Sequence, residues 1–211
     1  MALRRGLPLA LLVLALAACG GGSKSSSSAL NCMEGGGPTN DKTMKPPTEP
    51  LDTAKTYRVK IVTNKGSFSF SLDPKMSPAN TASFAKLVQA RFFNGTIFHR
   101  IVPGFVIQGG DPTGTGGGGP GYECIDTPPA TASYVHGVVA MAKGSQDPAG
   151  TGGSQFFVVT AADAQLTPDY AILGKVTSGI ATVNRIGKLG NPNTQQPTKR
   201  VVIEKATLDV S

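Results

Sequence analysis

Residues 57–72 alternate apolar and polar side chains on both sides of a short turn. The apolar positions are Tyr57, Val59 and Ile61 before the turn, and Phe68, Phe70 and Leu72 after it. Successive side chains of a β-strand point to opposite faces, so this pattern predicts an antiparallel hairpin around Asn64-Lys65-Gly66. One face of the hairpin is apolar and has to be covered by other elements of the fold.

Further segments with strand character follow, separated by turn residues: Ile97–His99, Val106–Gln108, Gly137–Ala142, Gln155–Thr160, Ile172–Val176 and Val201–Val210. Two helices are also predicted. Ser77-Pro78 begins the first, which ends near Asn94-Gly95, and the second covers Gly179–Ile186. Short strands with two helices indicate a mainly β fold, a closed antiparallel barrel capped by the helices.

The first 18 residues predict an export signal. Met1–Arg5 is basic, and the apolar run Leu7–Ala18 is too short to span a bilayer. The run ends in Leu16-Ala17-Ala18-Cys19, which resembles the bacterial lipobox. We therefore expect a lipoprotein signal peptide over residues 1–18, diacylation of Cys19, and anchoring on the extracytoplasmic side of the cell membrane. The alternative is an ordinary secretory signal cleaved near Ala18, with an incidental cysteine.

Residues 19–52 are rich in Gly, Ser, Pro, Thr and Lys and contain few aliphatic side chains. Such a segment buries too little apolar surface to offset its ordering entropy, so a lipidated flexible tether is predicted, followed by a folded domain over 53–211. Cys32 and Cys124 remain. In an oxidising compartment they form a disulfide or, alternatively, stay as two unpaired thiols.

The composition argues against several classes of partner. The 211 residues carry a net charge of +7, or about +5 without Arg4 and Arg5 of the signal, but the cations are scattered. We therefore expect no nucleic-acid partner. The residues Gly114–Gly121 lack the Gly-Lys-Ser/Thr ending of a phosphate-binding loop and predict a loop beside a groove. The histidines are far apart in the sequence, so we expect no metal site, no cofactor, and a monomer.

Two segments place polar side chains among aromatic ones. Residues 98–111 hold Arg100, Phe105 and Gln108 within a short apolar stretch, and Gln155 precedes Phe156-Phe157. Neither segment contains a plausible nucleophile or metal cluster. This combination suits binding and polarising a neutral amide better than breaking one.

From about Tyr57 onward the sequence resembles the cyclophilins, the peptidyl-prolyl cis-trans isomerases. The motifs are Phe98-His99-Arg100, Pro103-Gly104-Phe105, Gln108-Gly109-Gly110-Asp111, Gly137–Ala142 and Gly153–Phe157. The resemblance implies an eight-stranded antiparallel barrel capped by two α-helices. It also implies isomerisation of X–Pro bonds in proline-containing polypeptides without a cofactor.

The resemblance also assigns site residues. Arg100 would be the catalytic arginine, with His99 beside it in the groove. The other substrate-binding positions would be Phe105, Val106, Gln108, Ala142, Lys143, Gln155, Phe157, Leu166 and Tyr170. Gln165 stands where tryptophan is common in the family, which implies weak affinity for cyclosporin.

The residues themselves allow less specific interpretations. Phe156 is expected in the core and Phe157 in the groove, because neighbours on a strand face opposite ways. Gln108 could instead satisfy a buried backbone group, and a lone arginine on a strand is most often a solvated charge. We expect an isomerase that assists the folding of exported polypeptides. The alternative is a surface-anchored module or chaperone that binds proline peptides, with incidental catalysis.

Overall fold

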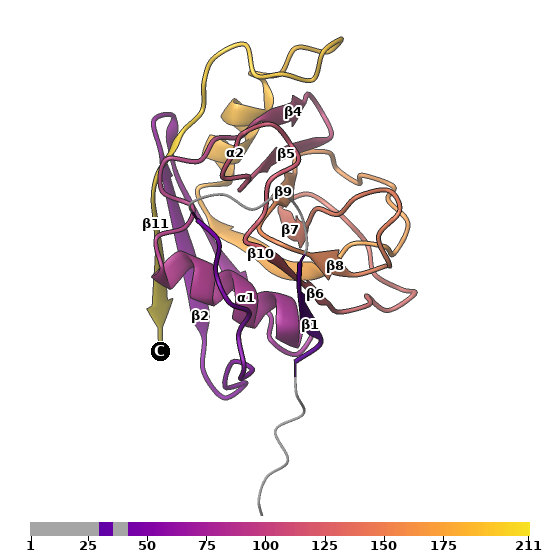
Figure 1. The fold of residues 1–211 in the computed structure, drawn as a ribbon. Helices are drawn as coiled ribbons and strands as arrows, with labels where there is room; N and C mark the ends of the chain where they lie inside the picture. The colour runs from indigo at the N-terminus through magenta and orange to yellow at the C-terminus, as the bar shows by residue number, and fades with distance from the viewer. Residues whose placement is uncertain (1–29, 36–41) are drawn as a thin grey trace, which may run out of the picture.

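The computed structural model describes residues 30–35 and 42–211 (Figure 1). Within these residues, eight strands form one antiparallel sheet in the order β11–β2–β3–β10–β7–β9–β5–β4. In that order the bounds are Ile203–Val210, Tyr57–Thr63, Gly66–Leu72, Ile172–Ser178, Val138–Met141, Phe156–Val159, Val106–Gly109 and Arg100–Val102. A second sheet has the order β1–β6–β8, with bounds Cys32–Glu34, Tyr122–Ile125 and Thr151–Gly152. The predicted hairpin is β2–β3, and its strands pair as the alternation required.

The large sheet curls into a half-barrel, and its ladder remains open between the edge strands β4 and β11. Backbone hydrogen bonds between residues 95–98 and 201–203 lie in this gap, including Phe98 N to Val201 O at 3.0 Å. The predicted strand Ile97–His99 is wrong, because Ile97 makes only isolated bridges to Val202 and Asp111. A closed barrel is therefore not shown by the pairing, whereas the mainly β fold with two helices is.

The strands at the centre of the sheet are buried on both faces. Every residue of β7 and β9 is buried. Alternate residues divide between two clusters: Val139, Met141, Phe156 and Val158 lie in the main core, and Val138, Ala140, Phe157 and Val159 in a smaller second cluster. The opposite faces predicted for Phe156 and Phe157 are confirmed. Each fully buried large side chain contributes about 1.5–3 kcal/mol, so both clusters stabilise the strands that carry the candidate site.

Two helices, α1 (Pro78–Gln89) and α2 (Ile180–Gly187), lie at opposite ends of the curled sheet (Figure 1). The carboxylate of Asp126 accepts hydrogen bonds from Ala79 N at 3.2 Å and Asn80 N at 2.6 Å, which satisfies free amides at the start of α1. The helix ends five residues before the predicted end, because Arg91 adopts a left-handed backbone with φ 59°. Among the described residues, no helix is long and apolar enough to cross a bilayer.

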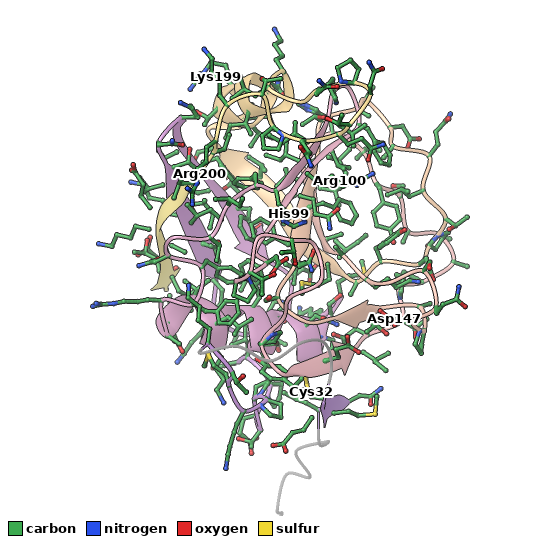
Figure 2. All side chains as sticks on the ribbon, turned by 45° about the horizontal axis from the view of Figure 1, so that its top comes forward. Cys32, His99, Arg100, Asp147, Lys199 and Arg200 are labelled. Carbon is green, nitrogen blue, oxygen red and sulfur yellow. A yellow bond between two sulfur atoms is a disulfide. The ribbon has the colours of Figure 1, made fainter. Side chains whose placement is uncertain are left out.

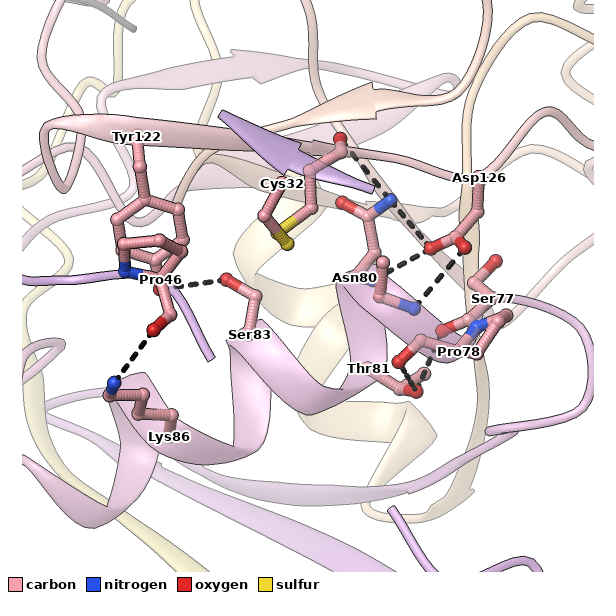
Figure 3. The surroundings of a disulfide bond; sticks show 12 residues. Cys32, Pro46, Ser77, Pro78, Asn80, Thr81, Ser83, Lys86, Tyr122 and Asp126 are labelled. Atoms are coloured by element: carbon pink, nitrogen blue, oxygen red, sulfur yellow. Dashed lines mark hydrogen bonds between the residues drawn. A yellow bond between two sulfur atoms is a disulfide. The ribbon is translucent and has the colours of Figure 1, made fainter. Parts of the chain in front are cut away.

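Parts of the predicted tether pack against the domain. Residues 32–34 form β1, which pairs with β6, and a disulfide joins Cys32 to Cys124 (Figure 3). Lys86 Nζ on α1 donates to Pro46 O at 3.0 Å, and Lys42 Nζ donates to Phe92 O at 2.9 Å. For residues 30–35 and 42–52, the expectation of a flexible tether is therefore wrong. Strand pairing and the disulfide hold this segment against the domain, although its composition provides little apolar surface to bury. Residues 1–29, including Cys19, lie outside the described residues.

Candidate active site

The register of three strands brings the predicted site residues into one row. Arg100 on β4 pairs with Gln108 on β5, and Gln108 pairs in turn with Phe157 on β9. Directly paired residues project their side chains to the same face of an antiparallel sheet. A guanidinium, an amide and an aromatic ring therefore lie side by side on the face opposite the main core.

A cavity of about 170 Å³ lies on this face. Nine residues line it, and all nine are among the predicted site residues: Arg100, Phe105, Val106, Gln108, Ala142, Lys143, Phe157, Leu166 and Tyr170. The cavity is apolar on one side and polar at Arg100 and Gln108. We call this cavity the small pocket. Gln155 lines a neighbouring cavity of about 350 Å³, which also includes Gln108, Ala142 and Lys143.

A chain of hydrogen bonds connects the polar side chains. Arg100 Nη1 donates to Gln108 Oε1 at 3.1 Å, and Gln108 Nε2 donates to Gln155 Oε1 at 3.1 Å. Gln155 Nε2 then donates to the carbonyl oxygens of Gly116 and Gly118. The chain fixes the orientation of both amides. It also shows that Gln108 bonds to side chains of the site, not to a buried backbone group.

The glycine-rich loop lies beside the groove, as predicted, and is organised by a buried carboxylate. The side chain of Asp111 accepts hydrogen bonds from Thr113 N at 2.7 Å, Thr113 Oγ1 at 2.8 Å and Gly116 N. Burial alone would raise the pKa of Asp111, but these hydrogen bonds outweigh it and hold the pKa below its ordinary value. Asp111 therefore places the carbonyl groups that receive the Gln155 amide.

Comparison with known proteins decides the family. The family model described as cyclophilin type peptidyl-prolyl cis-trans isomerase/CLD matches residues 58–208. Peptidyl-prolyl cis-trans isomerase-like 1 of Mus musculus is 38% identical over 161 residues, which cover 74% of this chain and 95% of the mouse protein. Peptidyl-prolyl cis-trans isomerase B of Bacillus subtilis is 41% identical over 121 residues, which cover 57% of this chain and 82% of the bacterial protein.

The chain belongs to the cyclophilin-type peptidyl-prolyl cis-trans isomerases. A crystal structure of a cyclophilin type peptidyl-prolyl cis-trans isomerase of Cryptosporidium parvum has a TM-score of 0.67 and 34% identity to this chain. The match covers 73% of this chain and 98% of the parasite protein. A second structure of that protein, with a TM-score of 0.66, 34% identity and coverage of 72% and 98%, was determined in the presence of the dipeptide Ala-Pro.

One wall of the small pocket in this cyclophilin is held by Tyr134, a residue that the sequence did not indicate. The ring of Tyr170 lies edge-on to Phe157, with centroids 5.4 Å apart. Tyr134, which is fully buried, donates its hydroxyl to Tyr170 O at 2.7 Å and accepts from Tyr170 N at 2.9 Å. Burial raises the pKa of Tyr134, which keeps this donor protonated. Residues 126–136 show no periodicity in the sequence, so nothing there indicated this role.

Lys143 also supports one wall of the small pocket. Its Nζ lies 2.8 Å from Asp169 Oδ2, and its side chain is only 5% exposed. The same ammonium is 5.8 Å from the centroid of the Tyr170 ring. Lys143 therefore joins the end of β7 to the wall that carries Tyr170. This ion pair could not be predicted, because Asp169 lies 26 positions further along the chain in an irregular segment.

His99 does not line either cavity of the site, although it precedes Arg100 directly. His99 lies just ahead of β4, outside the strand that carries Arg100 (Figure 2). The Nδ1 atom of His99 is buried without a hydrogen-bond partner. Burial lowers the pKa of His99, and the charge of Arg100 lowers it further against the opposing effect of Asp111.

We expect acid to destabilise this cyclophilin partly through His99. The unfolded imidazole takes up a proton near its ordinary pKa of 6.5, whereas the folded one resists protonation until lower pH. Between the pKa of the folded state and 6.5, the unfolded state binds more protons than the folded state. The stability that is present above pH 6.5 is therefore lost as the pH falls below it. Urea unfolding of the wild type and His99→Gln at about pH 7.5 and about pH 5.5 measures the effect. An identical pH dependence in both proteins would contradict the prediction. The wild type and the variant have to be compared because the raised pKa of Glu123 changes stability with pH in the opposite direction.

Proposed function

We propose that the small pocket binds the proline ring of a peptide and that Arg100 catalyses isomerisation of the preceding bond. The observation that carries this proposal is the convergence of nine predicted residues on one cavity. Phe105, Phe157 and Leu166 supply rigid apolar contacts for the ring. Gln108 and Gln155 supply amide groups that bond to a peptide backbone without adding charge.

Arginine suits this chemistry for a physical reason. Resonance makes the X–Pro amide planar, with a rotation barrier of about 18–20 kcal/mol. In the twisted transition state the proline nitrogen recovers a lone pair, and a donor directed at that nitrogen binds the twisted form more tightly than either planar form. The guanidinium of Arg100 remains protonated and presents a rigid fork of donors. No titrating acid or base is needed for this step.

Turnover of a model peptide tests the assignment against the alternative of a binding module. The domain from about residue 30 onward, incubated with a short Ala-Pro peptide, is expected to accelerate cis–trans exchange well above the uncatalysed rate of tens to hundreds of seconds. Two-dimensional exchange NMR measures this rate directly. A module that only holds proline segments would shift peptide resonances without raising the exchange rate, and that result would contradict catalysis.

We further propose that the protein is anchored by lipid outside the cytoplasm and assists the folding of exported polypeptides. The lipobox-like sequence Leu16–Cys19 supports this localisation. The disulfide between Cys32 and Cys124 also supports it, because such bonds persist mainly in oxidising compartments.

Replacement of the lipidated cysteine tests the anchor. Cys19→Ser is expected to move the protein from the membrane to the soluble fraction, because the acyl chains can no longer be attached. Fractionation followed by immunoblotting measures the change. Asn31→Ser, beyond the signal, is the matched control and should leave the protein on the membrane. Retention of the Cys19→Ser protein on membranes would show that another feature anchors it.

A further inference from the structure

Arg100 has a second hydrogen-bond partner, which comes from a distant loop. Its Nε donates to Gln195 Oε1 at 2.7 Å, across 95 positions of sequence. Gln195 lies in the segment between α2 and β11 and lines neither the small pocket nor the neighbouring cavity. Gln195 therefore contacts Arg100 from outside the two cavities of the site.

The backbone around Gln195 is organised to make this contact. Gln195 has φ 60°, a left-handed conformation that is unfavourable for a residue with a side chain. Hydrogen bonds hold it there: Gln195 N donates to Asn191 O at 2.8 Å, and Gln195 O accepts from Ile101 N at 2.8 Å. Gly190 permits this close approach, since a Cβ on it would lie 2.2 Å from Ile101 O. The loop is thus seated against the edge of β4.

We propose that Gln195 is a positioning residue for Arg100. This inference rests on the proposed catalytic role of Arg100. The planar guanidinium is held at two nitrogens, with Nε on Gln195 and Nη1 on Gln108. Two acceptors on different atoms of a rigid plane fix both its position and its tilt, which a single acceptor does not.

The effect on catalysis follows from this restraint. A donor accelerates a reaction most when it already points to the place where charge develops, so that no reorganisation is needed in the transition state. Without the amide of Gln195, the guanidinium can rotate about its side-chain bonds and spends part of its time misdirected. Binding of the ground-state peptide depends on the small pocket, which Gln195 does not line. The cost therefore falls on kcat and not on KM.

A double-mutant comparison tests this role. Glycine accepts the left-handed backbone without strain, so Gln195→Gly removes the amide and leaves the loop intact. We expect kcat to fall roughly tenfold with KM almost unchanged, and the melting temperature to stay the same or rise. The adjacent, exposed Gln196 provides the matched control, and Gln196→Gly should retain wild-type kinetics. In the Arg100→Ala background, Gln195→Gly should change the rate by less than about twofold, because its target is gone.

A spectroscopic measurement reports the contact itself. The Nε–H resonance of Arg100 is expected to be protected from exchange with water in the wild type and exposed in Gln195→Gly. The inference is overturned if Gln195→Gly turns over peptide at the wild-type rate, or if it slows the wild-type and Arg100→Ala proteins by the same factor. Wild-type activity of Arg100→Ala would instead refute the proposed role of Arg100, so the two failures are distinguishable.

Discussion

Arg100→Ala is expected to lower kcat/KM for a prolyl peptide by about two to three powers of ten. One preorganised donor in a site of this kind contributes about 3–4 kcal/mol to the transition state. Arg100 is half-buried and bonds to two glutamine side chains, so its removal leaves no charged partner buried. The fold should therefore persist, which a thermal melt and circular dichroism verify before kinetics are measured.

Two further variants sharpen this result. Arg100→Lys keeps the positive charge but loses the planar fork, so we expect activity between those of the wild type and the alanine variant. Arg200→Ala removes an exposed arginine that lines neither cavity, and it should isomerise at the wild-type rate. If Arg100→Ala, correctly folded, stays within a factor of about three of the wild type, less than the contribution of a single donor, the proposed mechanism is wrong.

Reduction of the disulfide is expected to lower the free energy of unfolding by roughly 4–5 kcal/mol. Cys32 and Cys124 are 92 positions apart, so the bond restricts a long loop of the unfolded chain, and the chain-entropy relation gives this magnitude. For a domain of this size the change corresponds to a fall in melting temperature of about 10–15 °C. Differential scanning calorimetry with and without a reductant measures it.

The control is the double variant Cys32→Ser/Cys124→Ser, which should melt at the temperature of the reduced wild type and show no response to reductant. Cys32 lies well away from Arg100 (Figure 2), so peptide isomerisation below the melting temperature should be unchanged. A shift smaller than about 1 kcal/mol, well below the range for a native disulfide, would show that the bond contributes little beyond the contacts of β1 with β6.

Sequence periodicity predicted those parts of the fold whose burial is regular. Burial alternates along β2 as the sequence does, whereas in β3 Ser69 is buried together with Phe68 and Phe70. The central strands and α2 lie within two residues of their predicted bounds. The end of α1 was missed because apolar residues continue beyond it. Phe92 and Phe93 are buried, although the helix has ended before Arg91, which has a left-handed backbone. β1, β6 and β8 were missed because their contacts are non-local, and β4 was expected three residues too early, at Ile97–His99. β1 has three residues, too few to show a periodic pattern in the sequence.

The residues that line the small pocket were predicted, whereas the residues that hold them in place were not. Arg100 and Phe157 lie on strands that flank β5, which carries Gln108, so identifying the motifs also located the residues of the small pocket. Tyr134, Asp169 and Gln195 escaped prediction because each reaches its partner from an irregular segment. His99 lines neither cavity, and its contact with a substrate stays a prediction. Loop-borne contacts depend on the finished tertiary structure, which local sequence does not encode.

The covalent link between β1 and β6 also has a mechanical consequence. A pull applied at the N-terminal end passes through Cys32 directly into Cys124, so the stretch between them, residues 33–123, carries no tension. The hairpin, α1 and the strand bearing Arg100 all lie in that bypassed stretch. Tension between the two ends of the chain would therefore leave the strand that carries Arg100 unstretched.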